Sequence, residues 1–426
     1  MPVRASALVL FLASLVGLAC SENDSTPPWP DDGRLLPPGL GSSPGTEPSI
    51  ASSGVNVLPI VVNAGPAYQA TNPSSLYVNG AFASVTVCAP GTSDCQTIDG
   101  LLVDTGSVGL RILSSALTVS LADATSNGIP LSECTLFLTN YTYGPLKLAD
   151  VTMAGETAAN IEIQVIDATA SVPSSCSGSG LPANDTLATL AANGILGIGP
   201  FLQDCGESCV SDAPASPAFY YTCPSAGCQD VGMSLAQQLP NPVASLAGDN
   251  NGIVIELPEV PAAGAATLSG AVVFGIGTRA NNAFSGSTVL PLDSAGNFAT
   301  VFQNVPTSSS FADTGSDGIF FADASSLGIS VCPDMTSFYC PSTTQNYTAV
   351  LGSTGSTGST GTSVKFSIAN ADDLITQNPT YAAYGNLGGP GGGSFDWGLP
   401  FFYGRRVFVA LAEQATPAGP GPYLGF

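Results

Sequence analysis

The 426-residue chain contains no histidine. This absence excludes every mechanism that needs an imidazole, such as Ser-His-Asp or Cys-His catalysis, and also zinc sites with histidine ligands. Basic residues are scarce as well, because 8 Lys and Arg stand against 31 Asp and Glu for a formal net charge of −23. A chain with so few cations cannot neutralise a phosphate backbone, so we expect no nucleic-acid partner.

Charged residues of either sign are few, at 9% of the chain, whereas 44% of the residues are hydrophobic. Glycine and proline are abundant, with 49 and 34 copies. Helix-breaking residues at this frequency favour a turn-rich β protein over a helical one. Beyond the N-terminal segment, no stretch of the sequence approaches the roughly 18 unbroken apolar residues that a membrane-spanning helix needs.

The first 20 residues have the pattern of an export signal. A basic residue precedes an apolar stretch from Ala5 to Ala19, which is too short to span a bilayer stably. The ending Gly-Leu-Ala-Cys resembles a bacterial lipoprotein signal, in which Cys20 would carry a lipid anchor in the membrane. Gly17 departs from the leucine usual in that motif, which leaves a periplasmic or secreted protein as the alternative. Ser21 favours the outer membrane over the inner one.

The rest of the chain divides into three segments by composition. Residues 21–57 are rich in Pro, Gly, Ser and acids, which predicts a flexible tether. Residues 58–239 and 240–426 each contain short β-type runs separated by turn residues, which predicts two β lobes. The best candidate for a helix is GMSLAQQL at residues 232–239, which a proline closes.

Eleven cysteines are present, and ten remain if Cys20 is lipidated. An even number in an exported protein predicts disulfides. Proximity in the sequence favours four bridges, namely Cys88–Cys95, Cys205–Cys209, Cys223–Cys228 and Cys332–Cys340, and leaves Cys134 and Cys176 to each other as the fifth. The alternative is a four-thiolate zinc site in the cluster that runs from Cys205 to Cys228.

The motif Asp-Thr-Gly-Ser occurs twice, at Asp104 in LLVDTGSVGLRI and at Asp313 in FADTGSDGIFF. In each copy an apolar run delivers the aspartate, and the glycine lets backbone N–H groups approach the carboxylate. One such turn is an ordinary β-turn, but two copies with alike flanks and a domain's length between them predict a pair. Two apposed carboxylates share one proton, which supplies an acid and a base without histidine.

Further segments around these turns resemble the pepsin-like, two-lobed aspartic peptidases, and more narrowly an uncharacterised bacterial family of exported proteins with that fold. The resemblance covers residue 76 to the C-terminus, and its motifs occur in the same order. They are LYVNGAFASVTVC before the first turn, TNYTYGPLKLADVTMAG, GILGIG, GMSLAQQLPNPVASL, SGAVVFGIG, LPFFYGRRVFVALAE and PYLGF. The resemblance implies an all-β fold of two pseudo-twofold-related lobes with a cleft between them.

Carried over residue by residue, the resemblance makes Asp104 and Asp313 the catalytic dyad that polarises a water. The supporting residues would be Thr105 and Thr314 as cross-braces, Ser107 and Ser316 on the outer carboxylate oxygens, and Gly106 and Gly315 for close backbone approach. Tyr143 and Gly144 would form the flap over the substrate.

The sequence also departs from that family in three places. The expected flap is short, Arg111 stands near the cleft where a tryptophan usually partners the flap tyrosine, and the second glycine loop is Asp396-Trp-Gly-Leu. The favoured function is nevertheless an aspartic endopeptidase, with a peptide or protein substrate, no cofactor, no metal and a monomeric chain. The alternatives are a catalytically silent envelope lipoprotein that binds peptide or glycan in the cleft, and a structural scaffold.

Overall fold

A computed structural model describes residues 48–71, 76–210, 219–352 and 361–426. The predicted signal peptide, Cys20 and residues 21–47 of the predicted tether lie outside the described residues. No helix in these ranges has the length and apolar character needed to cross a membrane.

The described residues form three β-sheets and a few short helices. The largest sheet has the strand order β11(Gln229–Asp230), β10(Tyr220–Thr222), β6(Ile129–Leu136), β7(Tyr141–Met153), β8(Glu156–Ile166), β4(Val108–Leu113), β9(Gly194–Ile198), β3(Cys95–Asp104), β2(Gly80–Cys88), β1(Val57–Asn63), β13(Leu268–Phe274), β12(Gly252–Leu257), β22(Arg405–Ala410), β25(Tyr423–Gly425), β14(Val289–Pro291), with β5(Thr125–Ser126) beside β6. The second sheet has the order β19(Thr362–Ile368), β18(Gln345–Gly352), β15(Phe298–Phe302), β16(Val305–Ala312), β21(Phe395–Trp397), β17(Ile319–Phe321), β20(Gly388–Pro390). The third pairs β23(Ala415–Thr416) with β24(Gly419–Pro420).

The helices are one or two turns long. They are α1(Gly65–Thr71), α2(Ser174–Ser177), α3(Leu187–Leu190), α4(Ala324–Leu327) and α5(Ala371–Gln377), with 3-10 turns η2(Ser114–Ala116), η3(Gly206–Cys209), η4(Leu235–Gln237), η5(Ala280–Asn282) and η6(Leu399–Phe401). Helix α5 has a sequence signal, because Asn370 caps it by accepting a hydrogen bond from the backbone N–H of Asp373.

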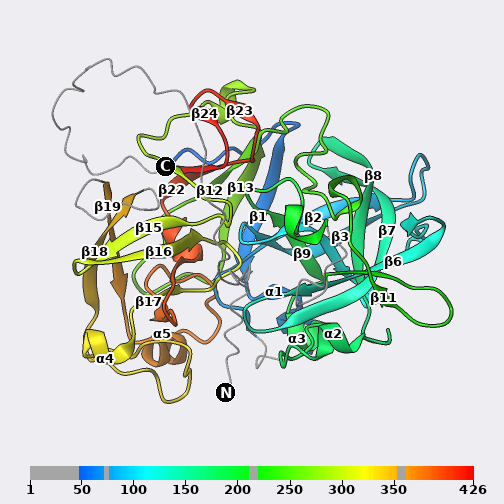
Figure 1. Ribbon diagram of the computed structural model, residues 1–426. Helices are drawn as coiled ribbons and strands as arrows, with labels where there is room; N and C mark the ends of the chain where they lie inside the picture. The colour runs from blue at the N-terminus through cyan, green and yellow to red at the C-terminus, as the bar shows by residue number, and fades with distance from the viewer. Residues whose placement is uncertain (1–47, 72–75, 211–218, 353–360) are drawn as a thin grey trace, which may run out of the picture.

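The strands form two lobes, which are joined by the central strands β1, β13 and β12 of the largest sheet. Figure 1 shows the strands of the first half on the right, those of the second half on the left, and β1, β12 and β13 between them. Strand β1 pairs with β2 of the first half and with β13 of the second, so it joins the two halves directly. The all-β, two-lobed architecture expected from the sequence is confirmed.

Each lobe repeats one three-strand arrangement around its Asp-Thr-Gly-Ser turn. In the first lobe β9 lies between β3, to which it is parallel, and β4, to which it is antiparallel. In the second lobe β21 lies in the same way between β16 and β17. The turn that joins the outer two strands therefore sits at the same sheet edge in both lobes, and this places both aspartates at the interface.

Buried aliphatic and aromatic side chains form one large cluster that extends from strands β1, β12 and β13 into both lobes. In the second lobe this cluster contains the aromatic rings of Phe302, Phe321, Phe366, Phe395 and Trp397. The rings of Phe395 and Trp397 stack with centroids 4.6 Å apart. Rings packed in this way hold β21 rigidly behind the second turn.

Two expectations about local structure are corrected. The helix expected at residues 232–239 is only the 3-10 turn η4, because Gln238 is extended and the backbone N–H of Leu239 donates to the Tyr220 hydroxyl. The last ten residues of the expected tether are held against the body. Asn56 is buried and donates to the carbonyl of Phe274, and the backbone N–H of Gly155 donates to the carbonyl of Val55.

Candidate active site

The two Asp-Thr-Gly-Ser turns meet at the lobe interface, and their carboxyls face each other. The backbone N–H of Gly106 donates to Asp104 Oδ1 at 2.8 Å and to Asp313 Oδ1 at 3.0 Å. The two carboxyls also act on each other, because the charge of Asp104 raises the pKa of Asp313. The structure therefore brings together two aspartates from opposite ends of the chain as one pair.

Gly106 and Gly315 allow this close approach. A Cβ at position 106 would lie 2.6 Å from Asp313 Cγ, and one at position 315 would lie 2.9 Å from Asp104 Oδ1. Real Cβ atoms do not come so close to other atoms. Any other residue at either position would therefore push the two carboxyls apart.

Hydroxyl groups fix the turns and the outer oxygens. The backbone N–H of Thr105 donates to Thr314 Oγ1 at 3.1 Å, and that of Thr314 donates to Thr105 Oγ1 at 3.0 Å. The hydroxyl of Ser107 donates to Asp104 Oδ2 at 2.5 Å, and that of Ser316 donates to Asp313 Oδ2 at 2.9 Å. The reciprocal threonine bonds tie the two lobes together at the level of the carboxyls.

The surroundings of the two aspartates shift their pKa values to different extents. Burial raises the pKa of Asp104, while hydrogen bonds with Asp313, Ser107 and Gly106 lower it. Burial raises the pKa of Asp313 well above its ordinary value, and the charges of Asp104 and Asp396 raise it further. These directions favour Asp313 as the carrier of the one proton that the two carboxyls share.

Three residues that lie at this site were not expected there from the sequence. Asp317 and Asp396 are buried, the charge of Asp396 acts on Asp313, and Tyr77 lies near Asp317, Asp104 and Asp313. Burial raises the pKa of the Tyr77 phenol, and the charges of Asp317, Asp104 and Asp313 raise it further. Asp317 follows the second Asp-Thr-Gly-Ser directly and Asp396 is the unusual residue of its glycine loop, but no sequence signal pointed to Tyr77.

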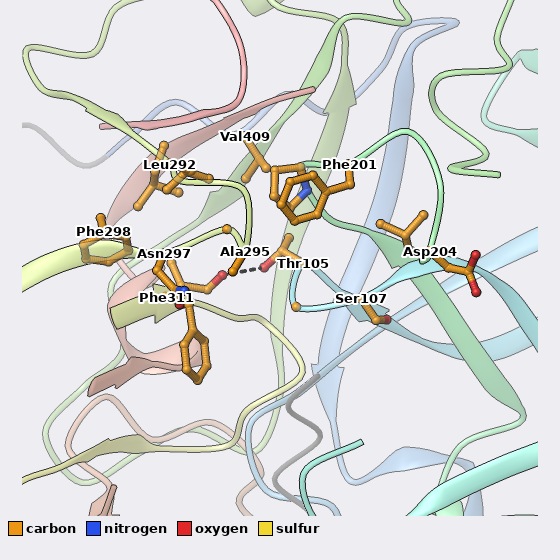
Figure 2. Close-up of a pocket in the computed structure, with 16 residues that line it drawn as sticks. Thr105, Ser107, Phe201, Asp204, Leu292, Ala295, Asn297, Phe298, Phe311 and Val409 are labelled. Carbon is orange, nitrogen blue, oxygen red and sulfur yellow. Dashed lines mark hydrogen bonds between the residues drawn. The ribbon is translucent and has the colours of Figure 1, made fainter. Parts of the chain in front are cut away.

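A pocket of about 70 Å³ lies beside the first turn, between the lobes. Figure 2 shows Phe298 and Phe311 of the second lobe on one side of it, Ser107 on the other, and Thr105 and Phe201 between them. Asp204 also lines the pocket, but its carboxylate points away from it. Apolar walls beside a polar turn suit the side chain of an extended peptide.

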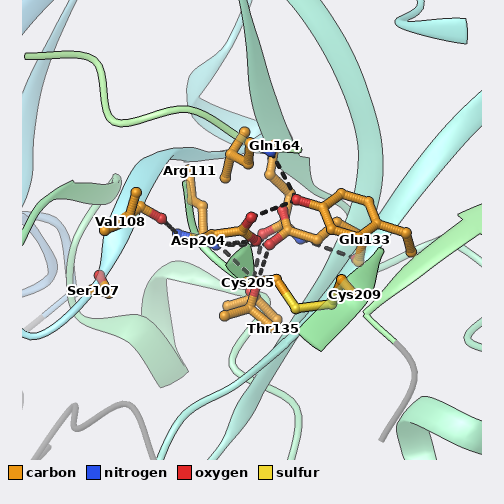
Figure 3. Close-up of polar contacts among 12 residues, drawn as sticks. Ser107, Val108, Arg111, Glu133, Thr135, Gln164, Asp204, Cys205 and Cys209 are labelled. Carbon is orange, nitrogen blue, oxygen red and sulfur yellow. Dashed lines mark hydrogen bonds and ion pairs between the residues drawn. A yellow bond between two sulfur atoms is a disulfide. The ribbon is translucent and has the colours of Figure 1, made fainter. Parts of the chain in front are cut away.

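Arg111 was expected to contact substrate in the cleft, but it lies in the interior of the first lobe. Its side chain is fully buried, and its guanidinium lies 2.7 Å from Glu133 Oε1 and 3.6 Å from Asp204 Oδ2 (Figure 3). It also donates to the carbonyl of Val108 and to Thr135 Oγ1. The tertiary fold surrounds this cation with acids from β6 and from the loop after β9, so Arg111 braces the end of the first turn from behind.

Two buried carboxyls, those of Glu133 and Asp204, lie next to one buried cation, Arg111. Glu133 Oε2 and Asp204 Oδ2 have no N–H or O–H donor among the described residues, and the two carboxyls face each other. Burial raises the pKa of Asp204 well above its ordinary value, and the charge of Glu133 adds to the rise. This direction favours the protonated form of Asp204, which lessens the negative charge around Arg111.

The expected flap is a hairpin of β6 and β7 whose outer edge is covered. Strand β10 pairs with β6, so the hairpin is an interior part of the sheet. Tyr143 is buried, with its hydroxyl 3.3 Å from Cys228 Sγ and its ring edge-on to Tyr221. Tyr143 thus packs against a disulfide in this structure, and no contact of it with the aspartates is seen among the described residues.

Gly144 is needed for packing. A Cβ there would lie 1.9 Å from the carbonyl oxygen of Val165, so the glycine admits the end of β8 against β7. We expect Gly144→Ala to lower the free energy of unfolding by about 1–3 kcal/mol, near the upper end, because this backbone cannot move aside. Denaturant titration measures the change. Gly248→Ala is the control, since its Cβ would meet only Glu156 Oε2 at 3.9 Å; equal stability of the two variants would contradict the prediction.

All five predicted disulfides are confirmed, namely Cys88–Cys95, Cys134–Cys176, Cys205–Cys209, Cys223–Cys228 and Cys332–Cys340. The four cysteines of the alternative zinc site are therefore oxidised in pairs. The Cys332–Cys340 bridge lies beside Asp372, where both sulfurs are engaged and no thiolate is left to bind a metal. Five bridges place the folded protein in an oxidising compartment outside the cytosol.

A family model described as "Protein of unknown function (DUF3443)" matches residues 52–426. The chain belongs to the DUF3443 family. No curated protein matches this DUF3443 chain in sequence. Among solved structures, it is similar to an aspartic proteinase from Irpex lacteus, with 14% identity, a TM-score of 0.47, and coverage of 87% of this chain and 96% of that one.

Proposed function

We propose that this protein is an aspartic-type endopeptidase that uses Asp104 and Asp313 to direct water against a peptide bond. The observation that carries the proposal is the shared N–H of Gly106, which holds both inner carboxyl oxygens at hydrogen-bond distance. Such a pair supplies one base and one acid in a protein without histidine.

In this mechanism a water lies against the pair, and Asp104 accepts a proton from it. The resulting hydroxide oxygen forms a bond to the amide carbon, while the proton of Asp313 passes to the carbonyl oxygen. Collapse of the tetrahedral intermediate breaks the carbon–nitrogen bond. The proton on Asp104 goes to the leaving amine, and Asp313 regains its own proton from the collapsing hydroxyl group.

Burial of the pair favours a second candidate function. Asp104 is 1% exposed and Asp313 is 0% exposed, so substrate reaches them only if the surrounding chain moves. A catalytically silent protein that binds peptide or glycan between the lobes needs no such movement.

Incubation of the mature protein with a mixed-peptide library, between strongly acidic and neutral pH, separates the two candidates. The peptidase should cut peptides, and a statine-type mimic of the tetrahedral intermediate should block the cutting. Binding of library peptides without any cleavage across this range would instead establish the silent protein.

We also propose that the protein is exported from a bacterial cell and anchored to the outer membrane through lipid on Cys20. The support is the signal-like N-terminus together with five disulfides. The intact mass of membrane-extracted protein should equal the chain from Cys20 plus lipid, and Cys20→Ser should release the protein from the membrane. An unmodified mass would contradict the anchor.

A further inference from the structure

Asn79, which directly precedes β2 of the first lobe, makes its side-chain hydrogen bonds with the second half of the chain. The residue is 0% exposed. Its Nδ2 donates to the carbonyl oxygens of Asp317 at 2.8 Å and of Tyr384 at 2.9 Å. Its Oδ1 accepts from the backbone N–H of Tyr384 at 2.7 Å and from the Tyr403 hydroxyl at 2.8 Å.

These four hydrogen bonds specify an amide at position 79. The two carbonyl oxygens can only accept, and the backbone N–H can only donate, so the side chain must offer two donors and an acceptor. A carboxylate lacks the donors, and an apolar side chain lacks both kinds of group. The backbone φ of 53° also lies in the left-handed region, where asparagine is enriched.

The segment that ends at Asn79 packs against both lobes. Leu76 and Val78 are buried in a cluster formed mainly by side chains of the second lobe, whereas Tyr77 between them is buried in a cluster of the first lobe. The backbone N–H of Asn79 donates to the carbonyl of Ala382 at 2.7 Å. The position of Asn79 is therefore fixed by contacts with the two lobes at once.

The contact with Asp317 has a counterpart in the first lobe. The residue four positions after the first dyad aspartate is Val108, whose carbonyl accepts a hydrogen bond from Arg111 Nη1 at 2.6 Å. The residue four positions after the second dyad aspartate is Asp317, whose carbonyl accepts from Asn79. Each catalytic turn is thus held at the same point by a buried side chain.

The internal repeat of the fold explains why the second turn takes its donor from elsewhere. Phe320 of β17 occupies the place of Arg111 of β4, since both lie seven residues after the dyad aspartate and pair with the central strand of their unit, β21 or β9. Phenylalanine has no side-chain donor. The second turn therefore receives from the first lobe, through Asn79, the hydrogen bond that the first turn receives from its own strand.

We propose that Asn79 is a positioning residue that fixes the second catalytic turn to the first lobe. Because Asp313 lies on this turn, its place relative to Asp104 depends on the Asn79 amide. The effect on catalysis rests on the proposed function. The effect on the turn itself does not, because it concerns only the folded state.

The test compares Asn79→Gly with Asn251→Ala in the full mature chain. Glycine adopts a left-handed backbone without strain, so Asn79→Gly removes the amide alone. Asn251 is the matched control because it is buried, its Nδ2 donates to the carbonyl oxygens of Ile276 and Ala415, and its Oδ1 accepts from the backbone N–H of Ile276. These partners belong to neither catalytic turn.

Hydrogen–deuterium exchange follows the two turns without any activity. In Asn79→Gly, the backbone amides of residues 313–318 should exchange faster relative to those of residues 104–109, by on the order of tenfold. Loss of a buried hydrogen bond favours local opening of the second turn, whereas Arg111 still holds the first. In Asn251→Ala the two turns should keep their relative exchange rates.

Peptide cleavage gives the second readout. In Asn79→Gly, kcat should fall by on the order of 10–100-fold with KM little changed, because a small displacement of Asp313 disturbs the dyad and leaves the substrate-binding walls in place. Asn251→Ala should keep the kcat of the wild type per folded molecule. If Asn79→Gly does not fold, Tyr403→Phe replaces it in both measurements. This variant removes the hydroxyl that donates to Asn79 Oδ1 and should give the same changes at smaller size.

The outcomes separate the two claims. Faster exchange confined to the second turn, with a loss in kcat that the control lacks, supports the role of Asn79. Unchanged relative exchange of the two turns, or an unchanged kcat in an active enzyme, overturns that role and leaves the proposed peptidase intact. Faster exchange of the second turn in a protein whose wild type cleaves no peptide upholds the hold of Asn79 on the turn and overturns the peptidase.

Discussion

Replacement of either Asp104 or Asp313 by asparagine is expected to abolish peptide cleavage, with a loss in kcat on the order of 10⁴-fold or more. The two carboxyls act as a unit, so each single replacement should cost nearly as much as both together. Single-turnover assays of both variants and the double variant measure the effect. Asp323→Asn is the control for the loss of one carboxylate, and substantial activity in Asp313→Asn would contradict the mechanism.

The same pair sets the pH dependence of the wild type. Catalysis needs the singly protonated pair, so kcat should follow a bell on the acidic side of neutrality. Both limbs belong to the pair as a unit: addition of a second proton forms the acidic limb, and loss of the shared proton, which burial favours, forms the alkaline limb. Since the chain has no histidine, no imidazole contributes to either limb.

Removal of the Arg111 guanidinium is expected to lower the free energy of unfolding by about 3–5 kcal/mol at neutral pH. In Arg111→Met, the side chains of Glu133 and Asp204 remain buried without their cation. The loss should be smaller at acidic pH, because protonation there removes the carboxylate charge that Arg111 no longer balances. Denaturant titration at several pH values measures both effects.

Lys147→Met is the matched control for Arg111→Met. Lys147 pairs with Asp123 at the surface, where side-chain exposures are 25% and 44%. A solvent-exposed pair contributes only about 0–1 kcal/mol, so this variant should stay near the wild type. Equal losses from Arg111→Met and Lys147→Met would show that burial of Arg111 adds nothing to the stability of the fold.

The sequence alone predicted the features that depend on local pattern. Alternating apolar residues and frequent turns predicted the strands, and the repeated Asp-Thr-Gly-Ser predicted two lobes that meet at Asp104 and Asp313. Cysteines close to one another in the sequence predicted four disulfides, and the two cysteines left over, Cys134 and Cys176, gave the fifth. Apart from that fifth bridge, each of these features is decided by residues that are neighbours in the chain or by an exact repeat.

The tertiary structure alone decided what surrounds the aspartates. Arg111 was expected at the cleft, but acids from β6 and from the loop after β9 draw it into the interior. Tyr143 was expected over the substrate, but β10 covers the hairpin and packs the ring against a disulfide. Asp396 is buried behind the second turn only because β21 pairs with both β16 and β17. Burial and charge at these positions depend on strands that pair across more than seventy residues of chain, and a sequence pattern does not show such contacts.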